Sequence, residues 1–191
     1  MGKSHNQGSY ELLLDKDDRT VASSAFLPKN IAEQQKQKVD RSAFQWKKGY
    51  NGVTAGDMDG AASTVTGPDG VKVPSTTSLD RAHLIANSDS TAFNNLTVGQ
   101  AQAKTFNNSN QVPFSSIMNQ GVMRHVEEAQ RKAASDSVSG VSKVVMPVYG
   151  KTGPRYGFNG NKHLELPESI ATCIVDSSAG KYSCVNLPNS A

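Results

Sequence analysis

An arginine and a histidine two residues apart, Arg81 and His83, are the first side chains here that could do chemistry. The residues around them predict a short strand over 79–86. Residues two apart on a strand share a face, so both side chains point one way, and Asp80 and Ala82 point the other way. Histidine can act as a base near neutral pH, and the arginine fork fits phosphate oxygens. The pair therefore predicts a base beside a phosphate clamp.

Downstream, residues 119–134 predict a helix that begins with the asparagine Asn119. An amide oxygen is a hard, neutral donor that suits Mg²⁺, which needs few protein ligands. Glu127 lies roughly 80° round the helix from Asn119 and could hold metal-bound water. Arg131 could meet a substrate phosphate or pair with Glu127 at i, i+4 spacing. The buried stripe of this helix is expected to be Val122, Val126, Ala129 and Ala133.

Together the two segments supply a base, charge neutralisation and leaving-group stabilisation, which phosphodiester cleavage needs. Each segment alone also fits a plain alternative: a partly exposed Arg-x-His pair with no role, or a solvated Glu/Arg helix face. Other chemistries find no support in the sequence. The two cysteines lack zinc-site spacing, and neither a phosphate-binding loop nor a G-x-S-x-G elbow is present. We expect surface positions for His5, His125 and His163.

At these residues the chain resembles the DNA/RNA non-specific endonuclease family of the ββα-metal (His-Me finger) superfamily. The family's Asp-Arg-Gly-His motif corresponds to residues 80–83, with Ala82 in place of glycine. Its Asn-x-x-Pro segment corresponds to residues 110–113. Its Asn-x-x-x-Trp helix begins at Asn119, with Met123 in place of tryptophan. The resemblance covers most of the chain, and its motifs are specific between residues 80 and 132.

The resemblance implies cleavage of DNA and RNA with little sequence specificity, supported by Mg²⁺, for which Mn²⁺ can substitute. It implies the general base His83 and the direct metal ligand Asn119, with Glu127 binding the metal through water. Arg81 and Arg131 would contact substrate phosphate, and Arg81 and Glu127 would count with His83 among the catalytic residues. Asn110, also placed with them, would support the site.

An upstream arginine that binds phosphate in some family members has no secure counterpart here. The candidates are Arg41, Lys47 and Lys48. The alternative function is a non-catalytic, nucleic-acid-binding relative of the same fold. The cue for it is Ala82, because an alanine would be strained if that backbone needed a positive φ.

The fold class expected is α+β: a mixed, mainly antiparallel sheet with a ββα-metal (His-Me finger) active-site motif. Residues 1–191 are expected to form one domain, with residues 1–9 flexible. Phe93 and Phe106 are expected to anchor a polar region to the core. The other expected elements are hairpins over 10–27 and 170–187, a capping-box helix from Asn30 with Glu33, a surface excursion over 41–78 and a buried strand over 144–148.

The bulk composition is compatible with this function without requiring it. The net charge of +3 tolerates a polyanionic partner, and no apolar run approaches the ~20 residues of a membrane span. The polar start does not read as a signal peptide. A secreted or delivered effector is favoured over a cytoplasmic protein, and such a toxin would need an immunity or inhibitor protein in its producer.

Cys173 and Cys184 flank a strand–turn–strand pattern. A turn centred on Ser178 and Ala179 would set the cysteines opposite each other, whereas a bulge at Gly180 would shift the pairing by one residue. The two are either disulfide-bonded or two small buried thiols. A bond would indicate an oxidising compartment.

Overall fold

The structure is a computed structural model, and it describes residues 2–42, 44–58, 64–67, 69–74, 78–150, 156–157 and 161–189. Parts of the expected surface excursion over 41–78 lie outside these residues. None of the helices in these ranges has the length and apolar character of a membrane span.

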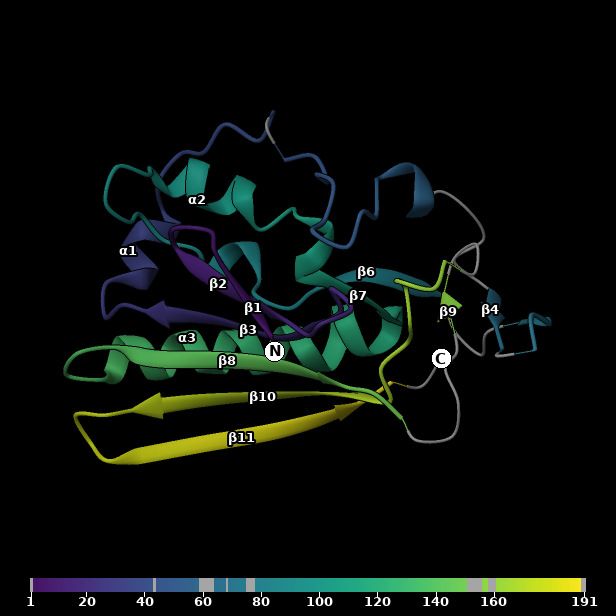
Figure 1. Ribbon diagram of the computed structural model, residues 1–191. Coiled ribbons are helices and arrows are strands. Elements are labelled where there is room, and N and C mark those ends of the chain that lie inside the picture. The colour runs from purple at the N-terminus through teal and green to yellow at the C-terminus, as the bar shows by residue number, and fades with distance from the viewer. Residues whose placement is uncertain are drawn as a thin grey trace.

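A six-stranded antiparallel sheet forms the body of the protein, in the order β1-β2-β3-β8-β10-β11 (Figure 1). Tyr10, Leu12 and Leu14 alternate with exposed neighbours, so one face of β2 is buried in the core. Both expected hairpins and the expected strand near residue 144 are confirmed. The strands are β1 (Lys3–Asn6), β2 (Tyr10–Leu14), β3 (Thr20–Leu27), β8 (Val141–Val148), β10 (Ser169–Asp176) and β11 (Lys181–Pro188).

The N-terminal segment departs from the flexible tail expected over residues 1–9. Residues Lys3–Asn6 form β1 and pair antiparallel with β2, from Lys3 opposite Leu14 to Asn6 opposite Glu11. This strand was not predicted because its residues are polar and show no strand pattern. An edge strand can be held by backbone hydrogen bonds without burying its side chains.

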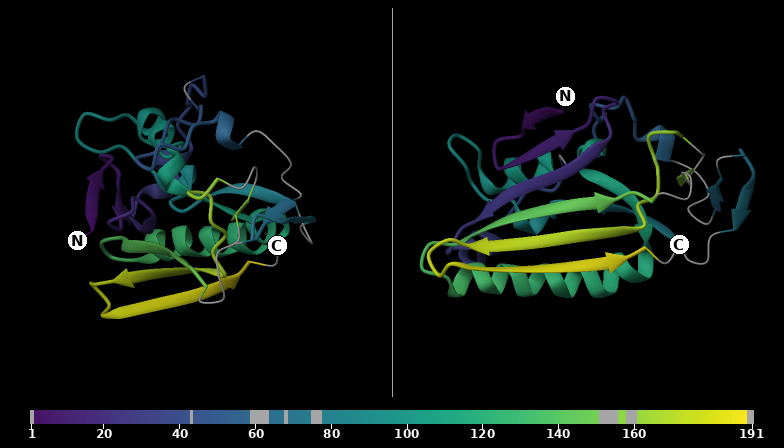
Figure 2. Two further views of the ribbon diagram at one scale, coloured as in Figure 1. Left: turned by 45° about the vertical axis from the view of Figure 1, so that its right-hand side comes forward. Right: turned by 60° about the horizontal axis from the view of Figure 1, so that its bottom comes forward.

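A long helix covers one face of the large sheet (Figure 2). It starts with a π-helical turn, Met118–Met123, and continues as α3 (Arg124–Asp136). Gln130 is buried, and its Nε2 donates to Thr172 Oγ1 of β10 at 2.9 Å, which ties the helix to the sheet. Sheet and helix together give an α+β protein with mainly antiparallel strands, which confirms the expected class.

The buried stripe of this helix is not the expected one. Met123, Gln130 and Ala134 are buried and Val126 packs partly against the core, whereas Val122 is exposed. Ala129 is exposed and Ala133 is only half-buried. Gln130 can occupy a core position because Thr172 accepts a hydrogen bond from its amide. The pattern of apolar residues alone therefore predicted the wrong face of the helix.

Smaller elements surround the sheet. One small sheet joins β4 (Thr64–Thr66), β5 (Lys72–Pro74) and β9 (Tyr156–Gly157), and β6 (Leu79–His83) pairs with β7 (Gln111–Ser115). The short helices are α1 (Ile31–Gln35) and α2 (Val98–Lys104), which begins with a capping box at Thr97 and Gln100. The 3₁₀ turns are Gly56–Met58, Asn87–Asp89 and Asn108–Asn110.

Two local expectations were wrong in this region. Asn30 makes no capping bond, and its Oδ1 instead accepts from Gln34 Nε2 at 3.0 Å. Phe93 is 48% exposed and so does not anchor the core, while Phe106 is half-buried. The α2 helix and the strand β7 were not expected, because α2 is short with weak helical periodicity and β7 contains a proline, which argues against a strand.

The two cysteines lie in the outermost hairpin, where Cys173 and Cys184 are directly opposite and joined by a disulfide. The β10–β11 register runs without a shift to the pair Asp176 and Lys181. Gly180 takes the positive φ of 62° that the turn needs, and no bulge displaces the pairing. Of the two alternatives, the structure has the disulfide.

Candidate active site

Two antiparallel strands followed by a helix position the candidate side chains. β6 and β7 pair with Arg81 opposite Pro113 and His83 opposite Gln111. The chain then enters the π-helical turn and α3, so a ββα unit is formed by residues 79–136. Ala82 packs in the core, and it does not have a positive φ. The feared strain at this position is therefore absent.

A cleft of about 320 Å³ opens between this strand pair and the helix. It gathers His83 from the end of β6, Asn119 from the π-helical turn and Glu127 from α3. Three of the expected site residues, 36 and 8 positions apart in sequence, thus lie around one hollow. The cleft is lined by His83, Ala86, Asn87, Asn119, Gln120, Arg124 and Glu127.

Aromatic rings enclose the imidazole of His83. The Trp46 ring lies 4.8 Å from it, and Phe106 meets it edge-on at 4.6 Å. Nε2 is buried and has no hydrogen-bond partner among the described residues. Burial lowers the pKa of His83 to about 4, so the ring is neutral at pH 7. Nε2 is enclosed by the protein.

Asn119 is held by a carboxylate. Its Nδ2 donates to Asp80 Oδ2 at 2.9 Å, while Ser116 Oγ and Gln120 Nε2 donate to the same carboxylate at 2.6 and 2.9 Å. A carboxylate only accepts from these groups, so the amide nitrogen must face Asp80. The amide oxygen of Asn119 is thereby left to a ligand on the other side.

Glu127 sits beside a buried group of charges. Its pKa is raised to about 7, chiefly by burial and also by Asp89, while Lys143 and Arg131 act in the opposite direction. Its carboxylate therefore titrates near neutral pH. A carboxylate in that state can accept a hydrogen bond from water when ionised and donate one when protonated.

Arg131 points into that charge group and is not among the residues that line the cleft. Its Nη1 lies 2.9 Å from Asp89 Oδ1, and Lys143 Nζ lies 2.6 Å from Asp89 Oδ2. Asp89 is fully buried, and the Lys143 side chain is 1% exposed. The expected pairing of Arg131 with Glu127 is replaced by a direct bond to Asp89.

Asn110 is fully buried and acts on the backbone around the site. Its Oδ1 accepts from Ser23 Oγ and Ile85 N, both at 3.0 Å. Its Nδ2 donates to Ile85 O and Thr105 O, at 2.9 and 3.0 Å. Two of these four bonds fix the backbone of Ile85, just after His83, and the other two tie Asn110 to Ser23 and Thr105. Arg81, half-buried on β6, lies outside the described lining of the cleft.

The segment that carries the upstream candidates for phosphate binding passes beside the site. Lys47 N donates to Phe106 O at 2.7 Å, and Asn108 N donates to Lys47 O at 3.0 Å, which places Trp46 against His83. The three candidate side chains are exposed and none lines the cleft. They are Arg41, Lys47 and Lys48.

Sequence reasoning missed several residues that shape the site. Asp80 was placed on the face away from His83, and its bond to Asn119 could not be read from strand alternation. Trp46 is the one tryptophan of the chain, a composition signal that was overlooked. The remaining missed residues are Asn87, Asp89, Phe106, Gln120 and Arg124.

The residues present suit a single hard cation. No group of three or more His, Cys, Asp or Glu side chains that could hold a metal occurs in the described part of the chain. Mg²⁺ does not need such a cage, since it keeps several waters and takes one or two protein oxygens. The fixed amide of Asn119 could offer one such oxygen, and Glu127 lines the same cleft.

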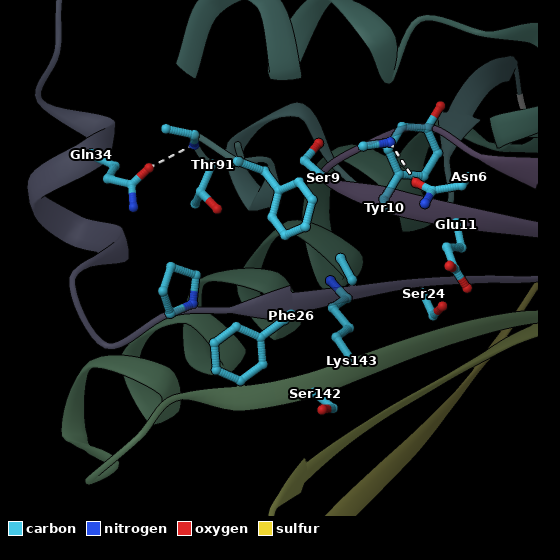
Figure 3. Close-up of a pocket in the computed structure, with 15 residues that line it drawn as sticks. Asn6, Ser9, Tyr10, Glu11, Ser24, Phe26, Gln34, Thr91, Ser142 and Lys143 are labelled. Carbon is cyan, nitrogen blue, oxygen red and sulfur yellow. Dashed lines mark hydrogen bonds between the residues drawn. The ribbon is translucent and has the colours of Figure 1, made fainter. Parts of the chain in front are cut away.

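A second hollow of about 400 Å³ lies across β2, β3 and β8, away from these residues (Figure 3). Phe26 of β3 and Lys143 of β8 are among its lining residues, and Gln34 Oε1 accepts from Ala92 N at 2.8 Å on one side. Its described lining contains neither a histidine nor an amide fixed by a carboxylate. The chemistry expected from the sequence therefore concentrates in the cleft at His83.

Comparisons with known proteins agree with this arrangement. The chain is similar to a chain in the crystal structure of the EndoG/EndoGI complex, with a TM-score of 0.68 and 18% identity, covering 99% of this chain and 75% of that one. The match assigns the ββα-metal fold. A search of curated proteins found no match. The model of the DNA/RNA non-specific endonuclease family matches residues 2–191, and the chain therefore belongs to that family.

Proposed function

We propose that this nuclease hydrolyses DNA and RNA with His83 as general base and with a Mg²⁺ ion at Asn119. The observation that carries the proposal is the cleft itself: a neutral imidazole, an amide oxygen held in place and a carboxylate line one hollow. Each group matches one requirement of phosphodiester hydrolysis.

His83 takes the proton of the attacking water at Nδ1. The pKa of about 4 keeps the ring unprotonated, and so able to accept a proton, at neutral pH. Trp46 and Phe106 fix the ring plane, so that Nδ1 keeps one direction. Attack on phosphorus breaks the bond to the 3′ oxygen and leaves a 5′ phosphate and a 3′ hydroxyl.

Mg²⁺ held at Asn119 would neutralise phosphate charge and stabilise the departing oxygen; Mn²⁺ would serve similarly. The chain's own part is orientation. Asp80 holds the Asn119 amide nitrogen, so the oxygen faces its ligand without searching. Glu127, ionised above its pKa of about 7, accepts hydrogen bonds from water in the cleft.

The test is digestion of supercoiled plasmid and of total RNA by wild type, His83→Ala and His163→Ala, each with Mg²⁺ and with EDTA. His163 lies outside the cleft and serves as the matched control. We expect wild type and His163→Ala to cleave both substrates only with Mg²⁺. The His83→Ala variant should lose about 10²–10⁴ in rate.

A folded His83→Ala variant with near wild-type cleavage would contradict the general base. Cleavage that persists in EDTA would contradict the metal. If folded wild type binds nucleic acid but cleaves nothing in Mg²⁺ or Mn²⁺, the protein is the non-catalytic relative instead.

We further propose that the chain is a secreted or delivered effector that meets a protein inhibitor. EndoG, to which it is structurally similar, was crystallised with EndoGI in a study of EndoG inhibition. Expression without an inhibitor should then be harmful, and His83→Ala should relieve the harm. Equal yields of wild type and His83→Ala would count against this role.

A further inference from the structure

The cleft needs a positive charge for substrate phosphate, and Arg124 supplies one. Among the seven described residues that line the hollow, it is the side chain with a permanent positive charge. His83 is neutral at pH 7, and the other lining residues are apolar, amide or carboxylate. Substrate entering between His83 and Asn119 therefore meets Arg124.

Arg131, the phosphate contact expected from the sequence, is already committed. Its guanidinium bonds fully buried Asp89 at 2.9 Å, and the side chain is only 19% exposed. Turning it toward a phosphate would leave Asp89 with Lys143 alone in the interior. A buried carboxylate that loses a charged partner is costly, so Arg131 remains in place.

The π-helical turn explains why Arg124 faces the cleft. It lies five residues after Asn119, and at ~100° per residue an α-helix would place it about 140° away. The turn Met118–Met123 is π-helical, with hydrogen bonds between residues five apart. This turn brings residue i+5 back toward the side of residue i, and both side chains line the same hollow.

Arg124 is held lightly and can change partner. Its Nε lies 3.2 Å from Glu128 Oε1, and the two side chains are 71% and 51% exposed. An exposed pair of this kind contributes little. Within the described part of the chain only Nε has a partner, so the Nη groups can make the bidentate, charge-assisted contact that a phosphate offers.

We propose that Arg124 binds a backbone phosphate of the nucleic acid in the cleft, and that Glu128 competes with this phosphate for the guanidinium. The inference rests on the proposed nuclease function and names a substrate contact for it. Arg124 is then a substrate-binding residue of the site, and Arg131 is a structural one.

The test compares Arg124→Ala with Lys132→Ala. Lys132 lies on the same helix, pairs with Asp136 at the same i, i+4 spacing and is equally exposed, but it is outside the cleft. Binding of a short DNA duplex is measured by fluorescence anisotropy against salt, in the His83→Ala background and in EDTA. Cleavage is measured in the otherwise wild-type chain with Mg²⁺.

Arg124→Ala should weaken DNA binding about 10-fold and lower the salt slope by about 1. It should also raise KM for cleavage, while Arg124→Lys restores part of the loss. Lys132→Ala should leave binding and cleavage close to the parent values. Thermal unfolding of both alanine variants should match wild type, because both contacts are exposed.

Glu128→Gln gives a second, opposite readout. Removing the competing carboxylate should tighten DNA binding by about 2- to 5-fold at low salt. The gain should vanish in the Arg124→Ala/Glu128→Gln double variant, since no guanidinium is left to release.

Failure of this inference is separable from failure of the proposed function. If wild type cleaves normally and Arg124→Ala behaves like Lys132→Ala, Arg124 is not the phosphate contact, although the nuclease stands. If binding falls with Arg124→Ala but no variant cleaves, the phosphate contact stands and catalysis is wrong. A chain that neither binds nor cleaves overturns both.

Discussion

Asp80 accepts a hydrogen bond from Asn119 Nδ2 at 2.9 Å, across 39 residues of sequence. The bond joins the first strand of the ββα unit to the start of its helix. Ser116 and Gln120 bond the same carboxylate, so the turn that carries Asn119 is fastened to β6 at three points. The orientation of the proposed metal ligand therefore depends on a residue outside the cleft.

Replacing Asp80 by alanine should weaken metal use. With its partner gone, the Asn119 amide can rotate, and loss of such a supporting contact typically costs about 10–100-fold in metal affinity or activity. We expect Asp80→Ala to need more Mg²⁺ for half-maximal cleavage and to recover part of its rate at high Mg²⁺. Asp136→Ala, which removes an exposed carboxylate from α3, is the control. Unchanged Mg²⁺ dependence in Asp80→Ala would refute the role.

Removing the tryptophan over His83 should raise the pKa of the base. Burial lowers this pKa to about 4, and Trp46 is part of that burial. Trp46→Ala admits water, so the pKa should rise by about 1 or more toward its ordinary value. A base fails once protonated, so the acidic limb of the pH–rate profile should move to higher pH by the same amount. Trp46→Phe, which keeps an aromatic ring, is the control. NMR titration of the metal-free protein measures the His83 pKa directly. A pKa still near 4 in Trp46→Ala would show that Trp46 does not lower it.

Sequence reasoning selected two proposed site residues that the structure brings to one cleft, His83 at the end of β6 and Asn119 in the π-helical turn. His83 and Asn119 were placed by residue chemistry and motif spacing, and both line the cleft. The outer hairpins were found because their runs of β-branched and apolar residues are local signals. Local signals suffice where neighbours in sequence decide the conformation.

The parts that were not foreseen depend on long-range contacts. The π-helical turn changes which face of the helix lines the cleft, and residues 118–123 carry no sequence signal that predicts such a turn. Gln130 took a core position because Thr172, 42 residues away, satisfies its amide. Arg131 was assigned to phosphate by the resemblance, and its ion pair with Asp89, 42 residues earlier, gave no signal in the sequence. Helical periodicity alone cannot reveal such partners.

Glu127 makes stability depend on pH. Burial raises its folded-state pKa from 4.5 to about 7, so the folded state binds the extra proton between these values. The contribution of Glu127 to stability therefore falls by on the order of 1–3 kcal/mol as pH rises from about 5 to 8, while His83, whose folded-state pKa is lowered to about 4, contributes in the opposite direction. Glu127→Gln cannot ionise and should lose less stability over this range, although its cleavage is impaired. Thermal unfolding at pH 5 and pH 8 checks this; an identical pH dependence in both proteins would contradict it.

Asp89 should matter for stability more than for chemistry. It is the shared acceptor of Arg131 and Lys143, and all three groups are largely removed from water. Asp89→Ala leaves a buried lysine without its partner, which should cost about 3–5 kcal/mol. Asp136→Ala removes an exposed pair with Lys132 and should cost no more than about 1 kcal/mol. Urea unfolding of the two variants gives the comparison, and equal midpoints would show that the buried group is not a structural centre.

The disulfide should stabilise the sheet edge that supports α3. It closes a short loop between β10 and β11, and β10 carries Thr172, the partner of Gln130 on the helix. A loop of this size contributes about 2–3 kcal/mol. Cys184 is exposed, so a reductant can reach the bond. We expect reduction to lower the unfolding midpoint of wild type and to leave a Cys173→Ser/Cys184→Ser variant unchanged. A thiol assay on denatured, unreduced protein should find no free thiols, because both cysteines are in the bond; two free thiols would show that the purified protein lacks it.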